Sequence, residues 1–139
     1  MIERYSFEVS GFRGAAVSTR KILIIDDSPV ARRILKSCMP KDPAYEFHEA
    51  VDGRSGLEKF KEIKPDITFM DITMPVMGGL ECLEEIMRFD AKAKIVMCTA
   101  DIQIKSLQRA LHLGALNILK KPPSCESVRQ IMAEVFEKD

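Results

Sequence analysis

Residues 67–83, ITFMDITMPVMGGLECL, run from an apolar segment into a carboxylate and then into a tight turn. The segment before Asp71 is β-branched, aromatic or otherwise apolar at nearly every position, which is typical of a strand covered on both faces. Met74-Pro75 and Gly78-Gly79 stop this strand, because proline fixes φ and removes a donor, and we expect the glycines to supply left-handed backbone. The stretch therefore predicts a buried strand with Asp71 at its end, where open α/β sheets bind ligands.

The same strand-then-helix pattern occurs five times along the chain. Strands alternating with amphipathic helices indicate right-handed crossovers and a parallel sheet with helices on both faces. The sequence therefore predicts a doubly wound α/β domain with one five-stranded sheet. The predicted strands are 21–26, 46–50, 67–71, 94–99 and 117–120.

Several residues mark the predicted helix ends. Ser28 is a candidate N-cap with Pro29 at the first helical position, and Pro40 and Pro43 end that helix. The other helices are expected over 53–63, over 79–89, between a capping Asp101 and Gly114, and from Ser124 onward. The apolar stripe of the first helix is predicted to be buried and consists of Val30, Ile34, Leu35 and Cys38.

The chain of 139 residues is long enough for one domain with its own core. We expect residues 1–20 to form a mobile extension, with the alternative that a strand within it pairs with a sheet edge or a second subunit, and residues 21–139 to form the domain. No segment approaches the roughly 20 apolar residues of a membrane span, and no leader is evident. A soluble, cytoplasmic protein is expected.

Composition excludes some classes of function. The 21 basic and 21 acidic residues give a formal net charge of +0, so the basic surface of a direct nucleic-acid binder is not expected. The four cysteines stand singly, which matches neither a metal or redox pair nor a secreted disulfide framework. They are therefore expected to be reduced thiols, mostly in the core.

Polar residues close the predicted strands. In a parallel sheet these ends lie on one edge, so far-apart residues should meet in space. Carboxylates a few ångströms apart repel by ~4 kcal/mol per close pair at an intermediate dielectric, and a hard divalent cation offsets this. Mg²⁺ is the expected metal, because it prefers oxygen ligands and neither histidine lies at a strand end. The strand-end residues are Asp26, Asp27, Asp71, Thr99 and Lys121.

These groups suggest phosphoryl chemistry. A carboxylate can attack a phosphoryl group when metal and ammonium charges offset the incoming anion. Asp71 is central and is the expected nucleophile, while Asp27, with Asp26, holds the metal. Thr99 offers a hydroxyl to a phosphoryl oxygen, and Lys121 neutralises another.

The motifs at these positions resemble those of the response regulator receiver domains of two-component signalling, in particular the stand-alone, chemotaxis-regulator type. The resemblance spans Lys21 to the C-terminus. It implies a flavodoxin-like sheet of order 2-1-3-4-5, phosphorylation of Asp71 by a histidine kinase or phosphotransfer protein, and Mg²⁺ held by Asp27, Asp71 and the backbone carbonyl of Thr73. The motifs are Ile24-Ile25-Asp26-Asp27-Ser28, 70–79 (MDITMPVMGG), Thr99-Ala100 and Lys121-Pro122.

Two positions depart from the family pattern. Gly78 stands where the family commonly has an acid, which should loosen the loop without removing chemistry. Ile118 stands where the family usually has an aromatic ring that moves with the threonine, so only the Thr99 half of that switch is implied. Lys121 is chosen over Lys120 because the family's lysine directly precedes proline.

The expected function is that of a signalling phosphoacceptor with a downstream protein target, bound through the face near the fourth strand, fourth helix and fifth strand, and not of a dedicated enzyme. A phosphatase of the haloacid-dehalogenase type would want an aspartate at Thr73, and a flavin-binding module would want a phosphate loop where Asp26-Asp27 stands. The alternative that stays open is a receiver-fold adaptor that acts without phosphorylation. The kinase, the target and the oligomeric state are not specified by the sequence.

Overall fold

The computed structural model describes residues 7–8, 12–13, 19–41, 45–100 and 103–137. Within them, strands and helices alternate regularly from residue 20 onward. The elements are β1 (Phe7–Glu8), β2 (Phe12–Arg13), β3 (Arg20–Ile25), α1 (Pro29–Cys38), β4 (Tyr45–Ala50), α2 (Gly53–Ile63), β5 (Ile67–Asp71), α3 (Gly79–Phe89), β6 (Ile95–Thr99), α4 (Ile104–His112), β7 (Asn117–Lys120) and α5 (Cys125–Glu137).

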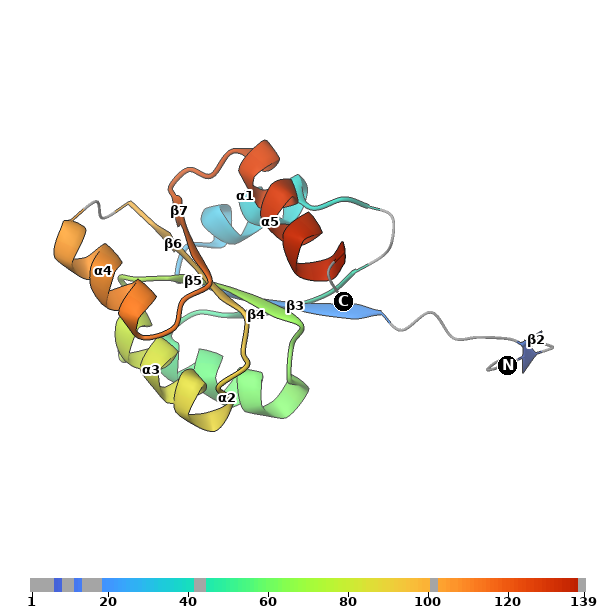
Figure 1. The fold of residues 1–139 in the computed structure, drawn as a ribbon, viewed down its shortest axis with the longest axis horizontal. Coiled ribbons are helices and arrows are strands. Elements are labelled where there is room, and N and C mark those ends of the chain that lie inside the picture. The colour runs from blue at the N-terminus through green and yellow to red at the C-terminus, as the bar shows by residue number, and fades with distance from the viewer. Residues whose placement is uncertain (1–6, 9–11, 14–18, 42–44, 101–102, 138–139) are drawn as a thin grey trace.

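Five of the strands form one parallel sheet in the order β4-β3-β5-β6-β7, which is the predicted order 2-1-3-4-5 (Figure 1). The doubly wound fold is thus confirmed. β4, the next strand along the chain, lies on one side of β3, and β5, the strand after it, lies on the other side. The carboxyl ends of β3 and β5 therefore flank a crevice, which is the usual ligand position in such sheets.

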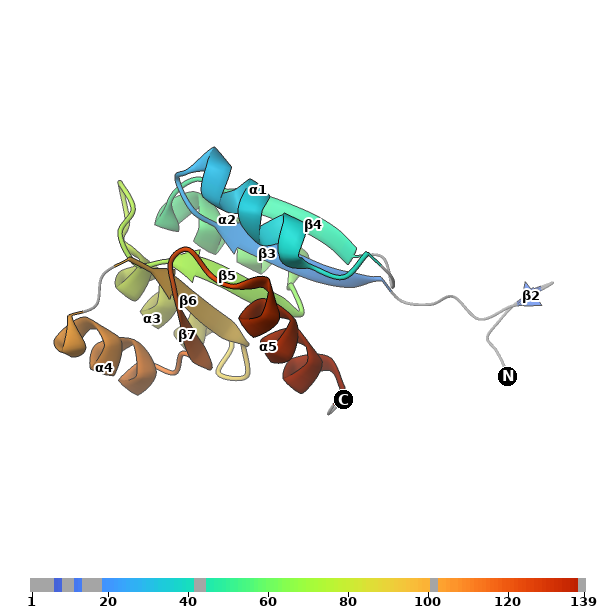
Figure 2. The ribbon, with the colours of Figure 1, turned by 90° about the horizontal axis from the view of Figure 1, so that it is seen from above.

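Helices cover both faces of the sheet. α1 and α5 lie on one face, while α2, α3 and α4 lie on the other (Figures 1 and 2). Alternate residues of β3 divide between the two cores: Ile22 and Ile24 pack toward α1 and α5, and Leu23 and Ile25 toward α2 and α3. All five residues of β5 are buried, as expected for a central strand.

Most predicted helix ends are confirmed. The Ser28 side chain caps α1 by accepting a hydrogen bond from Ala31 N at 3.1 Å, and Pro29 follows. Helices α2 and α3 span the predicted residues, and Gly114, with φ of 110°, follows the end of α4. α4 begins at Ile104 with Gln103 at the N-cap position, and the predicted cap Asp101 lies outside the described residues.

Two expectations about α1 are wrong. Val30 and Ile34 are 56% and 41% exposed, so only Leu35 and Cys38 of the predicted stripe are buried. Cys38 is also not a reduced thiol, because it forms a disulfide with Cys125 at the start of α5. The pairing could not be inferred from the spacing of 87 residues, since it depends on how α1 and α5 pack against one face of the sheet.

The short strands β1 and β2 pair with each other in antiparallel register and are not part of the five-stranded sheet. The rest of residues 1–18 lies outside the described part of the chain, so the mobile extension and the domain start at residue 21 remain predictions. No helix among the described residues has both the length and the apolarity needed to cross a bilayer.

Candidate phosphoacceptor site

Asp71 is the last residue of β5 and is only 8% exposed. Its backbone lies beside Cys98 of β6, while Met70 pairs with Ile25 of β3. The parallel register therefore carries the Asp71 side chain to the sheet edge where β3 also ends, as the sequence predicted.

The loop after Asp71 turns at a different residue from the one expected. Gly78 has a φ of −70°, and neither it nor Gly79 adopts left-handed backbone; Val76 does, with a φ of 69°. Gly79 is needed for another reason: a Cβ there would overlap the carbonyl oxygen of Asp71, and Gly79 N donates to the Ile72 carbonyl at 2.7 Å. The glycine permits a close approach of two backbone segments.

Asp26 and Asp27 follow β3. Asp26 is 5% exposed, and its Oδ1 accepts a hydrogen bond from Ser28 N at 2.9 Å, which fixes the carboxylate at the start of α1. Asp27 is exposed. Side-chain oxygens of Asp26, Asp27 and Asp71 all lie within 4.8 Å of one another. The three carboxylates predicted to meet at this edge do so.

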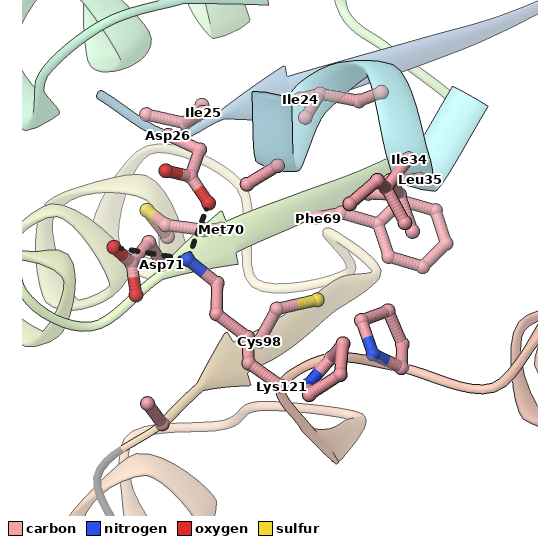
Figure 3. A pocket seen from close by; sticks show the side chains of 14 residues that line it. Ile24, Ile25, Asp26, Ile34, Leu35, Phe69, Met70, Asp71, Cys98 and Lys121 are labelled. Atoms are coloured by element: carbon pink, nitrogen blue, oxygen red, sulfur yellow. Dashed lines mark hydrogen bonds and ion pairs between the residues drawn. The ribbon is translucent and has the colours of Figure 1, made fainter. Parts of the chain in front are cut away.

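Lys121 is the cation of this cluster. Its Nζ lies 2.7 Å from Oδ2 of Asp26 and 3.4 Å from Oδ2 of Asp71, and Figure 3 shows its side chain reaching between them. Its backbone N donates to the Thr99 carbonyl at 2.9 Å, which ties the segment after β7 to the end of β6. Lys120 is exposed, so the assignment of the site lysine to Lys121 agrees with the geometry. The Lys121–Pro122 peptide bond is cis.

The two charged groups shift each other's protonation. Burial raises the pKa of Asp71, the charge of Lys121 opposes this, and the nearby Asp26 carboxylate adds to the rise. Burial disfavours the charged form of Lys121, but its hydrogen bond to Asp26 and the charges of Asp26 and Asp71 outweigh this and raise its pKa. Lys121 therefore stays protonated, while Asp71 carries a charge that one ammonium does not fully offset.

Thr99 and Thr73 lie beside this cluster. Thr99 ends β6 and is 3% exposed, one residue beyond the neighbour of Asp71 in the sheet. Thr73 is exposed, and a backbone hydrogen bond from it to the Asp71 carboxylate works against the rise in the pKa of that group. The hydroxyl role of Thr99 and the carbonyl-ligand role of Thr73 remain predictions.

The structure adds one residue that sequence reasoning missed. Arg32 donates through Nη1 to the backbone carbonyl of Asp26 at 2.6 Å, and its Nε pairs with Glu49 at 2.6 Å. It thereby fixes the backbone beside the acidic cluster. No sequence pattern predicts that a side chain at the start of a helix will contact the backbone carbonyl six residues before it.

An apolar cavity of about 310 Å³ opens beside the charged groups (Figure 3). The sheet, α1 and the segment after β7 enclose it, and Asp26, Asp71 and Lys121 form its polar end. Its apolar walls lower the local dielectric, which strengthens the interactions among these charges. The apolar lining includes Ile24, Ala31, Ile34, Leu35, Phe69, Cys98, Pro122 and Pro123.

The donor set fits a hard divalent cation. Three carboxylates and one ammonium leave a formal charge of −2 at the site. All candidate ligands are oxygens, which suits Mg²⁺, and no histidine or cysteine belongs to the cluster. Among the described residues this is the one group of three acidic, histidine or cysteine side chains close enough to share a metal ion.

Comparison with known proteins agrees with this geometry. Residues 22–133 match the model of the response regulator receiver domain family. The chain is 42% identical to the chemotaxis protein CheY of Thermotoga maritima over 103 residues, covering 74% of this chain and 86% of that protein. It is 39% identical to CheY of Bacillus subtilis over 108 residues, covering 78% and 90%.

A solved structure shares the fold. The CheX–CheY–BeF3–Mg²⁺ complex of Borrelia burgdorferi contains a chain that superposes with a TM-score of 0.77 at 32% identity, covering 84% of this chain and 89% of that one. The family model, the sequence relatives and the fold therefore agree with one another. The chain belongs to the response regulator receiver domain family of two-component systems.

Proposed function

We propose that Asp71 accepts a phosphoryl group from a histidine kinase or phosphotransfer protein in a Mg²⁺-dependent reaction. A carboxylate oxygen of Asp71 attacks phosphorus, the bond from phosphorus to the donor imidazole breaks, and the imidazole leaves with a proton. The product is an acyl phosphate on Asp71. The observation that carries this proposal is the formal charge of −2 around a buried carboxylate at the sheet edge.

The negative charge of the site has to be offset by a metal ion, because the incoming phosphoryl group is itself an anion. Asp27, Asp71 and the Thr73 carbonyl would hold Mg²⁺, with Asp26 beside them, and the metal would supply the positive charge that Lys121 alone does not. The CheY complex of Borrelia burgdorferi contains magnesium and BeF3, which supports this choice of metal. Lys121 Nζ is 3.4 Å from Asp71 and is placed to pair with a phosphoryl oxygen there.

The remaining residues prepare the site. The rise in the pKa of Asp71 through burial makes its carboxylate a better nucleophile than an exposed one. Thr99 would offer its hydroxyl to a phosphoryl oxygen and so report phosphorylation to the segment that follows β6. The protein is thus a phosphoacceptor that assists its own phosphorylation and dephosphorylation, not an enzyme with a separate substrate.

The output would be binding of a downstream protein. Three exposed apolar side chains lie on α4 and just before β7: Ile104 is 70%, Leu111 54% and Leu116 50% exposed. They offer a surface for a partner along α4, whose first residue, Ile104, follows the Thr99 end of β6 and whose last turn leads to Leu116 beside the start of that strand. The complex of a related CheY with CheX supports a protein partner.

Because phosphohistidine donors are made with ATP, we place this reaction in the cytoplasm.

The direct test is the intact mass after incubation with acetyl phosphate and Mg²⁺. One added phosphoryl group is expected in the wild type and in Asp90→Asn, a matched change at an exposed aspartate outside the site. No addition is expected in Asp71→Asn or in EDTA. If rapidly cold-quenched wild type with bound metal carries no phosphoryl group, the protein is instead an adaptor that acts unphosphorylated.

A further inference from the structure

The Cys38–Cys125 disulfide joins the last residue of α1 to the first residue of α5, and the proposed function makes no use of it. The Cα atoms lie 4.6 Å apart, within the usual range for a disulfide. The other cysteines, Cys82 and Cys98, are free and buried, and burial raises the pKa of each thiol to about 12, so they are inert.

The two helix ends stay together without the covalent bond. Arg129 of α5 donates through Nε to the Cys38 carbonyl at 3.0 Å. Val128 and Met132 of α5 share a core with Leu35 and Cys38 of α1. The Arg129 hydrogen bond reaches a backbone carbonyl, and Leu35 packs through its own side chain, so neither contact needs the sulfur–sulfur bond. Reduction therefore leaves the two thiols close together, ready to reoxidise.

The two cysteines differ in exposure. Cys38 is 1% exposed, whereas Cys125 is half-buried at the edge of the same core. A small thiol or disulfide therefore reaches Cys125 first. This arrangement of one accessible and one protected cysteine suits thiol–disulfide exchange, which needs an attackable sulfur and a neighbour that completes the reaction.

The disulfide is linked to the candidate site through a short, stiff segment. Cys125 follows Lys121 by four residues, and two of the three residues between them are Pro122 and Pro123. Lys121 in turn pairs with Asp26, which lies three residues before Pro29, the first residue of α1, and α1 ends at Cys38. The ion pair and the disulfide thus close a ring through α1 and the Lys121 segment.

We propose that Cys38 and Cys125 form a reversible thiol–disulfide exchange site whose oxidation holds Lys121 in place at the acidic cluster. The link to phosphorylation rests on the function proposed above. Disulfides inside cells are usually transient or redox-sensing, which fits an exchange site in a cytoplasmic protein. Oxidation would require a low-molecular-weight disulfide, such as oxidised glutathione, and reduction a thiol.

Oxidation of the cysteine pair proceeds in two exchange steps. The Cys125 thiolate attacks the small disulfide, forms a mixed disulfide and releases one small thiolate. The Cys38 thiolate then attacks the Cys125 sulfur and releases the second. Two protein thiols lose two electrons and two protons, and one small disulfide is reduced to two thiols.

The first experiment counts thiols in the folded wild-type protein. Samples kept in oxidised glutathione or in dithiothreitol are quenched in acid, unfolded, alkylated and weighed. Two alkyl groups are expected after oxidation and four after reduction, with full return on re-exposure to oxidised glutathione. Four groups after oxidation, or a disulfide that dithiothreitol cannot open while the protein is folded, would overturn the proposal.

The second experiment follows Lys121 by NMR in metal-free protein, so that it does not depend on phosphorylation. The ¹H–¹³C signals of its ε-methylene, assigned with Lys121→Arg, should shift between the oxidised and reduced forms, while those of Lys120 stay unchanged. In Cys38→Ser/Cys125→Ser the redox dependence should vanish, and in Cys82→Ser it should persist. Lys121 signals with the same chemical shifts in the oxidised and reduced forms would show that the disulfide does not position this residue.

The third experiment compares phosphorylation rates from acetyl phosphate and Mg²⁺. The oxidised protein is expected to react about threefold faster, because a preorganised ammonium stabilises the developing charge better than a mobile one. Equal rates would refute the link to phosphorylation. Absence of phosphorylation in both forms would refute the proposed function instead, while the thiol count and the Lys121 signals would still decide the exchange site.

Discussion

Lys121 lies closer to Asp26 than to the proposed phosphoacceptor: its Nζ is 2.7 Å from Asp26 Oδ2 and 3.4 Å from Asp71 Oδ2. Its strongest contact is thus with a carboxylate that is not itself the proposed nucleophile. The arrangement keeps one ammonium within reach of both carboxylates, so a small movement of the side chain can shift it toward a group placed on Asp71.

Lys121→Met is expected to destabilise the metal-free protein by roughly 2 kcal/mol, because it leaves Asp26 and Asp71 with an uncompensated charge in a largely buried site. It should also slow phosphorylation at least tenfold through the loss of its pairing with a phosphoryl oxygen. Lys120→Met, at an exposed neighbour, is the matched control. Urea unfolding and the intact-mass assay measure the two effects, and equal behaviour of the two variants would contradict the assignment.

Magnesium is expected to stabilise the folded protein. A ligand at a hundred times its Kd adds about 2.7 kcal/mol when it binds only the folded state. The melting temperature should therefore rise with added MgCl2 and fall back in EDTA. Asp27→Asn should remove most of the rise, whereas Asp90→Asn should keep it. A rise of the same size in Asp27→Asn would place the metal elsewhere.

The raised pKa of Asp71 makes its ionisation unfavourable for folding in the absence of metal. Its contribution to stability is fully present below its unfolded pKa, near 3.8, and is lost as pH rises through the folded value. In EDTA, Asp71→Asn should therefore be more stable than wild type at pH 7, by on the order of 1 kcal/mol. The difference should shrink as the pH is lowered toward 3. Denaturant titrations across this pH range measure the difference in the free energy of unfolding. A wild type that is more stable than the variant at pH 7 would contradict the prediction.

Gly79→Ala should destabilise the protein by about 3 kcal/mol or more, because the added Cβ would overlap the carbonyl oxygen of Asp71 and force the backbone apart. Gly78→Ala is the control: the nearest atom to a Cβ there is the Ile72 carbonyl oxygen at 3.7 Å, an ordinary contact. Its effect should stay below about 1 kcal/mol. Chemical denaturation of both variants decides between close approach and backbone freedom as the reason for this pair of glycines.

Val76→Asn should raise the free energy of unfolding by about 1 kcal/mol. Val76 has a φ of 69° and is 75% exposed, so it carries the cost of left-handed backbone for a β-branched residue with little burial in return. Asparagine tolerates this conformation. Val51→Asn, at a similarly exposed valine without positive φ, should change little. If both substitutions act alike, the gain comes from replacing an exposed apolar side chain with a polar one and not from relief of backbone strain.

Much of the fold was predictable because its signals are local. Some features act only on neighbouring residues and can therefore be recognised in the sequence. Examples are the helix cap Ser28, the apolar run before Asp71 and the turn at Gly114. The parallel sheet follows from the strand–helix alternation, and it alone brings Asp26, Asp27, Asp71 and Lys121 to one edge. The strand order came from the resemblance to a known family and is confirmed by the structure.

What only the tertiary structure decided depends on distances between segments that are remote in sequence. The Cys38–Cys125 bond, the exposure of Val30 and Ile34 and the contact of Arg32 with Asp26 all depend on how helices lie against the sheet. Local patterns carry no information about such placements, because periodicity defines which residues share a helix face but not which part of that face a neighbour covers. The sequence by itself determined the chemistry of the site, and the packing of α1 and α5 determined how that site is held.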